Sequence, residues 1–246
     1  MEKLKGRTAI VTGASRGIGK AITVMFGSEG ANVIVTARNE RAIGDVADHI
    51  VQHGGSALAV TADLSVDSDV QRIADETLSK YGQIDILVNN AGIIHPSTDL
   101  VDFDFELWRN VIAVNLEAAA LLTKYCLPSM IENSYGKIIN ISSIGGRKGA
   151  KGRSAYRATK AALISLTESV AAETKPHGID VNCICPGGVD TEGYREAFNT
   201  RGKADNPRMM APEEIAKLAV FLASDDSSSV TGTAIDAFGS TNPIFD

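Results

Sequence analysis

Residues 8–19 read TAIVTGASRGIG, and this stretch decides the fold of the chain. An apolar, β-rich run passes directly into a glycine-rich turn, which opens a segment with apolar residues at helical spacing. Glycine permits a tight turn and a close approach to a ligand, and the unpaired N–H groups at the start of a helix attract an anion. The glycines are spaced GxxxGxG here and GxGxxG in the generic anion-binding turn, but they serve the same physical purpose in both. The alternative is a plain strand-to-helix turn that binds no ligand. The residues predicted to bind the anion are Gly13, Ser15, Arg16, Gly17, Ile18 and Gly19.

Short apolar runs alternate with helical patterns along the whole sequence. Strands that are apolar throughout indicate a parallel sheet covered by helices on both faces, and strand–helix–strand units fit right-handed crossovers. With 246 residues and 44% hydrophobic content, we expect one domain, residues 1–246, with an α/β doubly wound fold. The seven expected strands occupy residues 8–11, 31–35, 57–60, 84–88, 137–141, 179–184 and 233–237, and the expected helices lie near residues 17–29, 40–53, 67–80, 103–132, 154–175 and 212–223.

Charge and composition exclude several classes of protein. The net charge is −6 and no long basic block occurs, which argues against a nucleic acid or an anionic membrane as partner. The amino end shows no signal-peptide or membrane-span pattern, so a cytoplasmic location is expected. The four histidines lack metal-ligand spacing, and Cys183 and Cys185, two apart in a strand, do not predict a disulfide. No metal site is expected.

A phenol, an ammonium and a hydroxyl are predicted to meet at one edge of the sheet. Tyr156 and Lys160 are four residues apart, hence on one face of the helix predicted at 154–175, and Ser143 follows the strand predicted at 137–141. Ligands bind at the carboxyl ends of strands in open parallel sheets. The pKa of a free tyrosine is ~10, so we expect Lys160 to favour the phenolate. Each residue alone is often structural, but the combination predicts proton chemistry at a carbonyl.

The end of the second predicted strand indicates which dinucleotide would bind. An NAD site usually presents a carboxylate there, whereas this chain has Thr36, Ala37, Arg38 and Asn39. The guanidinium groups of Arg38 and Arg16 are expected to bind a 2′-phosphate. NADP(H) is therefore favoured, and NAD(H) remains possible if Arg38 is solvated and Glu40 reaches the ribose.

Several motifs agree in order and spacing with one family. Besides the glycine turn and the Tyr156/Lys160 pair, the chain shows NNAG at 89–92, Asn115 in a predicted helix, and PGGVDT at 186–191. Over essentially its whole length it resembles the short-chain dehydrogenase/reductases. The resemblance implies a Rossmann-like fold, a homotetramer, and a catalytic set of Ser143, Tyr156, Lys160 and Asn115, with Asn115 holding a water near Lys160. It also implies cofactor contacts from Arg38, Asp63, Leu64, Asn90, Ala91, Gly92, Tyr156, Lys160, Pro186, Gly187, Val189 and Thr191.

Two irregular segments bear on the substrate. Residues 188–211 are expected to form a lid over the site. The cations of residues 147–153 would attract an acidic substrate or an acidic carrier protein. The alternative for these cations is a solvated loop or a contact between subunits. Phe245 or Asp246 is a candidate for reaching a neighbouring subunit's site. An apolar wall is expected from Ile93, Ile94, His95, Tyr194, Phe198, Met209 and Met210.

The leading hypothesis is an oxidoreductase that transfers a hydride between NADP(H) and a ketone or secondary alcohol, such as a small carbonyl compound, polyol or sugar derivative. The first alternative is a 3-oxoacyl-acyl-carrier-protein reductase, which general resemblance and the cationic loop support. The second is a protein that senses the cofactor without turnover, although neither Tyr156 nor Lys160 is lost.

Overall fold

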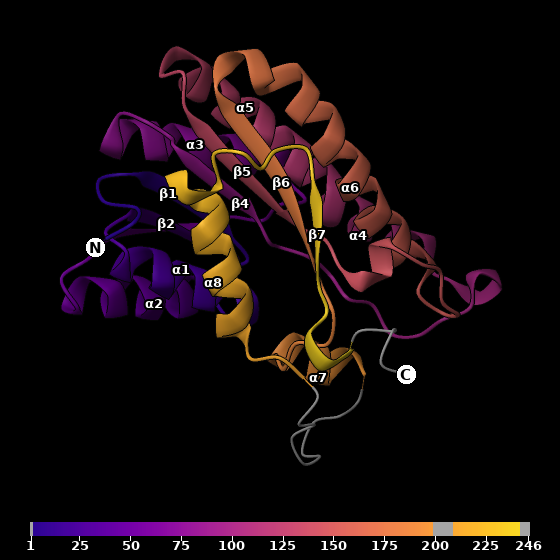
Figure 1. Cartoon of the computed structure of the whole chain (residues 1–246). Helices are drawn as coiled ribbons and strands as arrows, with labels where there is room; N and C mark the ends of the chain where they lie inside the picture. The colour runs from indigo at the N-terminus through magenta and orange to yellow at the C-terminus, as the bar shows by residue number, and fades with distance from the viewer. Residues whose placement is uncertain (1, 199–208, 242–246) are drawn as a thin grey trace.

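The computed structural model describes residues 2–198 and 209–241. Seven parallel strands form one sheet in the order β3-β2-β1-β4-β5-β6-β7 (Figure 1). The strand order reverses between β1 and β4, and such a reversal opens a crevice at the carboxyl ends of the strands. The strands are β1 Thr8–Thr12, β2 Asn32–Ala37, β3 Ser56–Thr61, β4 Ile86–Asn89, β5 Gly136–Ile141, β6 Ile179–Pro186 and β7 Ala234–Ala237.

Helices cover both faces of the sheet, as the apolar strands predicted. The helices α1, α2 and α8 pack on one face and α3, α5 and α6 on the other. The helices are α1 Gly17–Ser28, α2 Glu40–Gln52, α3 Asp67–Tyr81, α4 Phe105–Ile112, α5 Ala118–Glu132, α6 Ser154–Thr174, α7 Glu192–Ala197 and α8 Pro212–Ala223. The predicted α/β doubly wound fold is confirmed.

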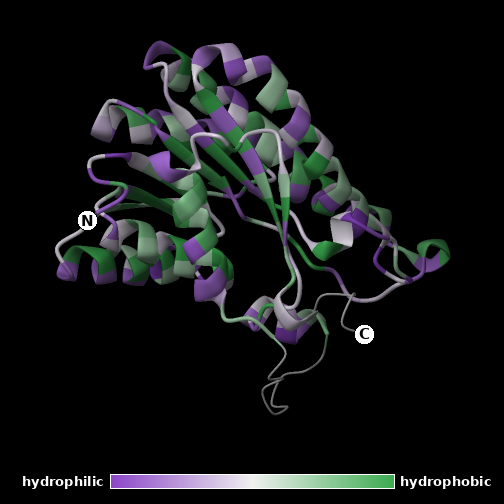
Figure 2. Cartoon of the chain, viewed as in Figure 1, coloured by the Kyte–Doolittle hydropathy of each residue, from purple (hydrophilic) through white to green (hydrophobic). Residues whose placement is uncertain are grey.

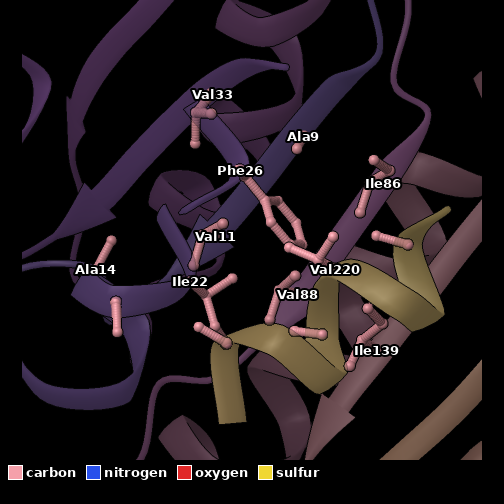
Figure 3. Close-up of a cluster of buried hydrophobic side chains, with 14 of the residues drawn as sticks. Ala9, Val11, Ala14, Ile22, Phe26, Val33, Ile86, Val88, Ile139 and Val220 are labelled. Carbon is pink, nitrogen blue, oxygen red and sulfur yellow. The ribbon is translucent and has the colours of Figure 1, made fainter. Parts of the chain in front are cut away.

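The core follows from the alternation of side chains along each strand. Val11 faces α1 and α8, whereas its neighbour Ile10 faces the opposite layer. Phe26 of α1 and Val220 of α8 meet over the sheet beside Val88 (Figure 3). The sheet is largely hydrophobic, with polar residues within β5 and β6 (Figure 2), because neither of its faces meets solvent. This rigid layer fixes the strand ends from which the site is built.

The long helix expected at 103–132 is two helices joined by a π-helical turn. α4 ends at Ile112, the turn spans Ala113–Glu117, and α5 begins at Ala118. A π-turn holds one residue more than an α-turn and occurs frequently at functional sites. The spacing of apolar residues could not reveal it, because both segments continue in nearly the same direction.

Three further expectations can be compared with the structure. The segment 188–211 contains the short helix α7, so it is less irregular than expected, and residues 199–208 lie outside the described part. All three cysteines are free and buried, and no metal-binding cluster occurs among the described residues. By length and composition alone Phe105–Glu132 is apolar enough to cross a membrane, but here Leu122 and Met130 are buried in the core.

Candidate active site

A cleft of about 1030 Å³ lies at the carboxyl ends of the strands, over the reversal of strand order. It extends from the glycine turn after β1, past the ends of β4 and β5, to the segment that follows β6. Every residue predicted to bind the cofactor lines this cleft, as do Ser143, Tyr156 and Lys160. Asn115 instead lines a small adjoining cavity.

The glycine turn has a backbone conformation that side chains would obstruct. Gly13 and Gly17 have φ angles of +65° and +55°, a region that favours glycine. A side chain on Gly19 would lie 2.2 Å from the carbonyl oxygen of Gly13. The start of α1 therefore opens directly into the cleft, with its N–H groups available to an anion.

Thr12, which sequence reasoning missed, joins the glycine turn to the segment after β4. Its hydroxyl oxygen accepts the backbone N–H groups of Asn90 and Ala91, each at 3.0 Å, and the Asn90 amide donates to the Thr12 carbonyl at 2.8 Å. These bonds hold the two walls of the cleft together. A threonine after a strand gives no local signal of this role, because its partners lie 78 and 79 residues away.

The two arginines expected at a 2′-phosphate differ in their surroundings. Arg38 is exposed at the end of β2 and lines the cleft, close enough to the Asp63 carboxylate to help lower the pKa of that group, although hydrogen bonds from Ser65 lower it more. Arg16 instead forms an ion pair with Glu196 of α7, with N–O distances of 3.0 and 3.1 Å. The structure therefore pairs Arg16 with α7, which the sequence did not predict.

Tyr156 and Lys160 lie together on α6, as their spacing predicted. The Lys160 ammonium donates to the Ile141 carbonyl at 2.7 Å and lies 5.7 Å from the centre of the Tyr156 ring. Burial lowers the pKa of Lys160 to about 8. Burial also raises the pKa of Tyr156, whereas a hydrogen bond with Ser143 and two nearby guanidinium groups lower it. The pKa of Tyr156 is thus raised, whereas the sequence predicted that Lys160 would favour the phenolate and so lower it. Burial of the phenol outweighs the favourable charges around it.

Ser143 lies two residues beyond the end of β5, near the tip predicted for it. Its hydroxyl oxygen accepts the Gly145 N–H at 2.9 Å, so its proton can take part in the hydrogen bond with Tyr156. The neighbouring Ser142 hydroxyl donates to the Lys160 carbonyl at 2.6 Å and so ties the end of β5 to α6. This pair of contacts fixes Ser143 and Tyr156 on the same side of the cleft.

Asn115 lies in the π-turn, buried, with its amide bonded to protein groups. The side-chain oxygen accepts the Ile93 N–H at 2.7 Å, and the side-chain nitrogen donates to the Ile93 carbonyl at 3.1 Å and the Thr159 hydroxyl at 3.2 Å. A side chain on Gly92 would lie 3.4 Å from the Lys160 nitrogen and 3.6 Å from the Asn115 side-chain oxygen. Gly92 therefore leaves open the space between Asn115 and Lys160, but the Asn115 side chain is held by Ile93 and Thr159.

The cationic loop 147–153 is less available than its sequence suggested. Arg147 pairs with Asp236 at 2.8 Å, Lys151 pairs with Asp99 at 3.3 Å, and Arg153 is buried. Lys148 remains exposed. The loop is thus mostly anchored to the protein, which weakens the argument that it recruits an acidic carrier.

The expected apolar wall is formed only in part. Ile93, Ile94, Tyr194 and Phe198 line the cleft, and the rings of Tyr194 and Phe198 stack with centroids 4.3 Å apart. Met210 is instead buried in the core and His95 beneath the start of α6, and neither they nor Met209 line the cleft. Phe245 and Asp246 lie outside the described residues.

Comparison with known proteins places this geometry in a family. Residues 7–202 match the short chain dehydrogenase family. The chain belongs to this family. Its match covers the glycine turn, the Tyr156/Lys160 pair and the helix α7. The protein is accordingly an oxidoreductase.

The relatives of this chain cover nearly its full length. It is 38% identical to an uncharacterized oxidoreductase of Bacillus subtilis, over 97% of this chain and 92% of the relative. It is 37% identical to a 3-oxoacyl-acyl-carrier-protein reductase of Vibrio cholerae, over 96% and 97%. A provisionally assigned NAD(P)-dependent gluconate 5-dehydrogenase of Beutenbergia cavernae, solved with bound NADP, has 36% identity and a TM-score of 0.88, with 98% of each chain covered.

Proposed function

We propose that this protein transfers a hydride between NADP(H) and a ketone or secondary alcohol, with Tyr156 as the proton donor. The observation that carries the proposal is the meeting of Tyr156, Ser143 and Lys160 in one cleft with the glycine turn. When bound, the nicotinamide would supply or accept the hydride at the carbonyl carbon. The NADP-bound neighbour supports a nicotinamide cofactor in a cleft of this fold.

The residues of the chain would carry the proton and the charge. The raised pKa keeps Tyr156 protonated at neutral pH, which suits an acid that donates its proton to the carbonyl oxygen during reduction. The Ser143 hydroxyl would donate a hydrogen bond to the same oxygen. Lys160, with a pKa of about 8, is mostly charged at pH 7 and would stabilise the phenolate that forms.

The cofactor would extend along the cleft from Arg38 and Asp63 to the strand ends. Arg38 is exposed and lines the cleft, so its guanidinium would bind a 2′-phosphate, and we favour NADP(H) on that basis. The pyrophosphate would rest on Gly13, Gly17 and the start of α1. Asn90, Gly92, Pro186, Val189 and Thr191 would surround the remainder.

An initial-rate screen tests the proposal. Oxidation of NADPH and NADH is followed with small ketones, sugar-derived ketones and acetoacetyl thioesters, and the reverse reaction with polyols and aldonates. The Tyr156→Phe variant should lose about 10²–10⁴-fold in turnover while still binding NADPH, and Tyr125→Phe, at a residue that does not line the cleft, is the control. Undiminished turnover in Tyr156→Phe would overturn the assignment of the acid.

The second candidate is a 3-oxoacyl-acyl-carrier-protein reductase, which the Vibrio cholerae relative favours. Rates with acetoacetyl thioesters that exceed those with free ketones by orders of magnitude would establish it. A protein that binds NADP without turnover is the remaining possibility, indicated by tight NADPH binding and no oxidation with any carbonyl.

A further inference from the structure

Two guanidinium groups flank the candidate acid at the substrate half of the cleft. Arg153 precedes α6 and Arg157 lies one turn further along, on either side of Tyr156 in the sequence. Both line the cleft, and both exert an electrostatic effect that lowers the pKa of Tyr156. Two positive charges therefore act on the place where a substrate carbonyl would bind.

Arg153 is buried without a carboxylate partner. Only 8% of the residue is exposed, and its donors bond to the backbone carbonyls of His95 and Ala197. Its guanidinium carbon lies 4.4 Å from the centre of the Phe198 ring. Among the described residues it forms no ion pair, so its charge is solvated by neutral dipoles alone, an arrangement that is unfavourable for a buried cation.

Arg157 is the cation whose side chain borders the reacting groups. A side chain on Gly145 would lie 3.3 Å from Cγ in the aliphatic stem of Arg157, 3.3 Å from the Ser143 hydroxyl and 3.4 Å from Cε1 of Tyr156, so the stem lies beside both groups. The guanidinium donates a hydrogen bond to the Lys148 carbonyl and acts electrostatically on Tyr156. A guanidinium carries five N–H donors in a planar fork, and no carboxylate in the described part of the chain is seen paired with this one.

The two carboxylates among the described lining residues of the cleft already have partners. Asp63 accepts hydrogen bonds from Ser65, and the charge of Arg38 also acts on it. Glu196 pairs with Arg16. Around Tyr156 the described lining thus holds the cations Arg153, Arg157 and Lys160, and neither of these carboxylates is paired with them. A cleft with low-dielectric walls and one sign of charge concentrates ligands of the opposite sign.

We infer that the substrate carries an anionic group, a carboxylate or a phosphate, which binds Arg157 next to the reacting carbonyl, with Arg153 behind it. Arg157 would form charge-assisted hydrogen bonds to the anion, and Arg153 would provide long-range attraction from its buried position. The inference rests on the proposed function for the position of the carbonyl, but the anion site itself does not depend on turnover.

The test compares an anion with a neutral analogue in two matched pairs. Calorimetry gives the Kd of acetoacetate and of methyl acetoacetate, and of dihydroxyacetone phosphate and of dihydroxyacetone, on the protein loaded with NADP⁺. Loading keeps the anions away from the glycine turn. The wild type, Arg157→Gln, Arg157→Lys and the exposed-loop control Lys148→Gln, which removes the same charge, are titrated with each compound.

The anion site predicts that wild type binds one or both anions more tightly than their neutral partners, and that Arg157→Gln raises the Kd of the anion by about 10–100-fold. Arg157→Lys should recover part of the loss, and Lys148→Gln should change little. An effect of Arg157→Gln on the Kd of acetoacetate indicates a carboxylate site, and an effect on the Kd of dihydroxyacetone phosphate indicates a phosphate site. Equal binding of anion and neutral partner by wild type, absence of binding by all four compounds, or equal effects of Arg157→Gln and Lys148→Gln would overturn the inference.

Oxidation of NADPH and NADH with the four compounds separates this inference from the proposed function. If no compound is reduced but the Kd of the anion still depends on Arg157, the proposed function fails and the anion site stands. If neutral ketones are reduced but the Kd of the anion does not depend on Arg157, the proposed function stands and the anion site fails.

Discussion

The Nε2 atom of His95 accepts the backbone N–H of Tyr156 at 3.3 Å. The N-terminal backbone N–H groups of a helix have no partner within the helix, and the residue before α6, Arg153, makes no side-chain cap. His95, in the segment after β4, supplies a partner for one of these N–H groups, that of Tyr156. Its Nδ1 lies 2.7 Å from the Pro96 carbonyl, so the proton resides on Nδ1 and Nε2 is left as the acceptor. The imidazole thus helps to position the helix that carries the candidate acid.

Replacing His95 with phenylalanine should destabilise the protein by about 1–2 kcal/mol through loss of this cap. His95 is 1% exposed, and burial lowers its pKa below the ordinary 6.5. The contribution of neutral His95 to the free energy of unfolding is therefore complete above pH 6.5, and it is lost as the pH falls through the lowered pKa of His95. Besides Arg153, which also lowers this pKa, Phe103 packs edge-on against the ring with centroids 4.7 Å apart.

Urea denaturation between pH 5 and 8 measures the effect. The difference in unfolding free energy between wild type and His95→Phe should shrink towards acid pH, whereas the difference between wild type and Gly44→Ala, which changes no titratable group, should stay constant. A constant difference across this range would contradict the role of neutral His95.

Replacing Lys160 with methionine should stabilise the protein at pH 7 and abolish turnover. The folded-state pKa of about 8 lies below the ordinary 10.5, so the buried charge opposes folding. Allowing for the lost hydrogen bond to Ile141, the gain is about 2 kcal/mol. The advantage of the variant should be largest below pH 8 and should shrink as the pH rises from 8 towards 10.5, and it should be lost above pH 10.5, where the lysine becomes neutral in the unfolded state as well. Thermal unfolding at pH 7 and 9.5 checks the sign.

Cofactor preference should depend on Arg38 more than on Arg16. Arg38→Gln is expected to raise the Kd of NADPH about tenfold or more and to change that of NADH little, since the lost partner is a 2′-phosphate. Arg16→Gln should have a smaller effect, because the guanidinium is shared with Glu196. Fluorescence titration of both cofactors measures the ratio, with Arg41→Gln on the exposed side of α2 as control. A larger effect of Arg16→Gln would reverse the ranking.

Two glycine-to-alanine variants should have opposite consequences. In Gly19→Ala the new methyl would lie 2.2 Å from the Gly13 carbonyl and 2.4 Å from the Asn90 amide nitrogen, so the turn must shift and cofactor binding should fall. In Gly44→Ala, within α2, no atom lies within 4 Å, and alanine favours a helix by roughly 0.5–1 kcal/mol. Unfolding and NADPH titrations compare them; equal cofactor affinity in both would disprove the close-packed turn.

Local signals predicted the parts of the site that are built locally. The sequence of residues 8–19 combines strand, turn and helix signals within one unit, and Tyr156 and Lys160 lie on one helix, so their spacing was sufficient. The seven strands and the two covered faces followed from the same kind of pattern.

Contacts between distant segments could not be predicted in this way. Arg16 and Glu196 are 180 residues apart, and His95 and Tyr156 are 61 apart. Nothing in the sequence near either partner distinguishes such a pair from solvated side chains, because only the folded sheet brings the segments together. The burial of Arg153 was missed for the same reason, since a cation in a charged loop is usually solvated.

The π-turn at Ala113–Glu117 makes this segment sensitive to its length. Because the π-turn holds one residue more than an α-turn, deleting a single residue between Ile112 and Ala118 would convert it into an ordinary α-turn and keep α4 and α5 in nearly the same register. Asn115 lies within the turn, however, so its contacts with Ile93 and Thr159 would be displaced. Substitutions along this helix should thus be tolerated where a one-residue deletion is not.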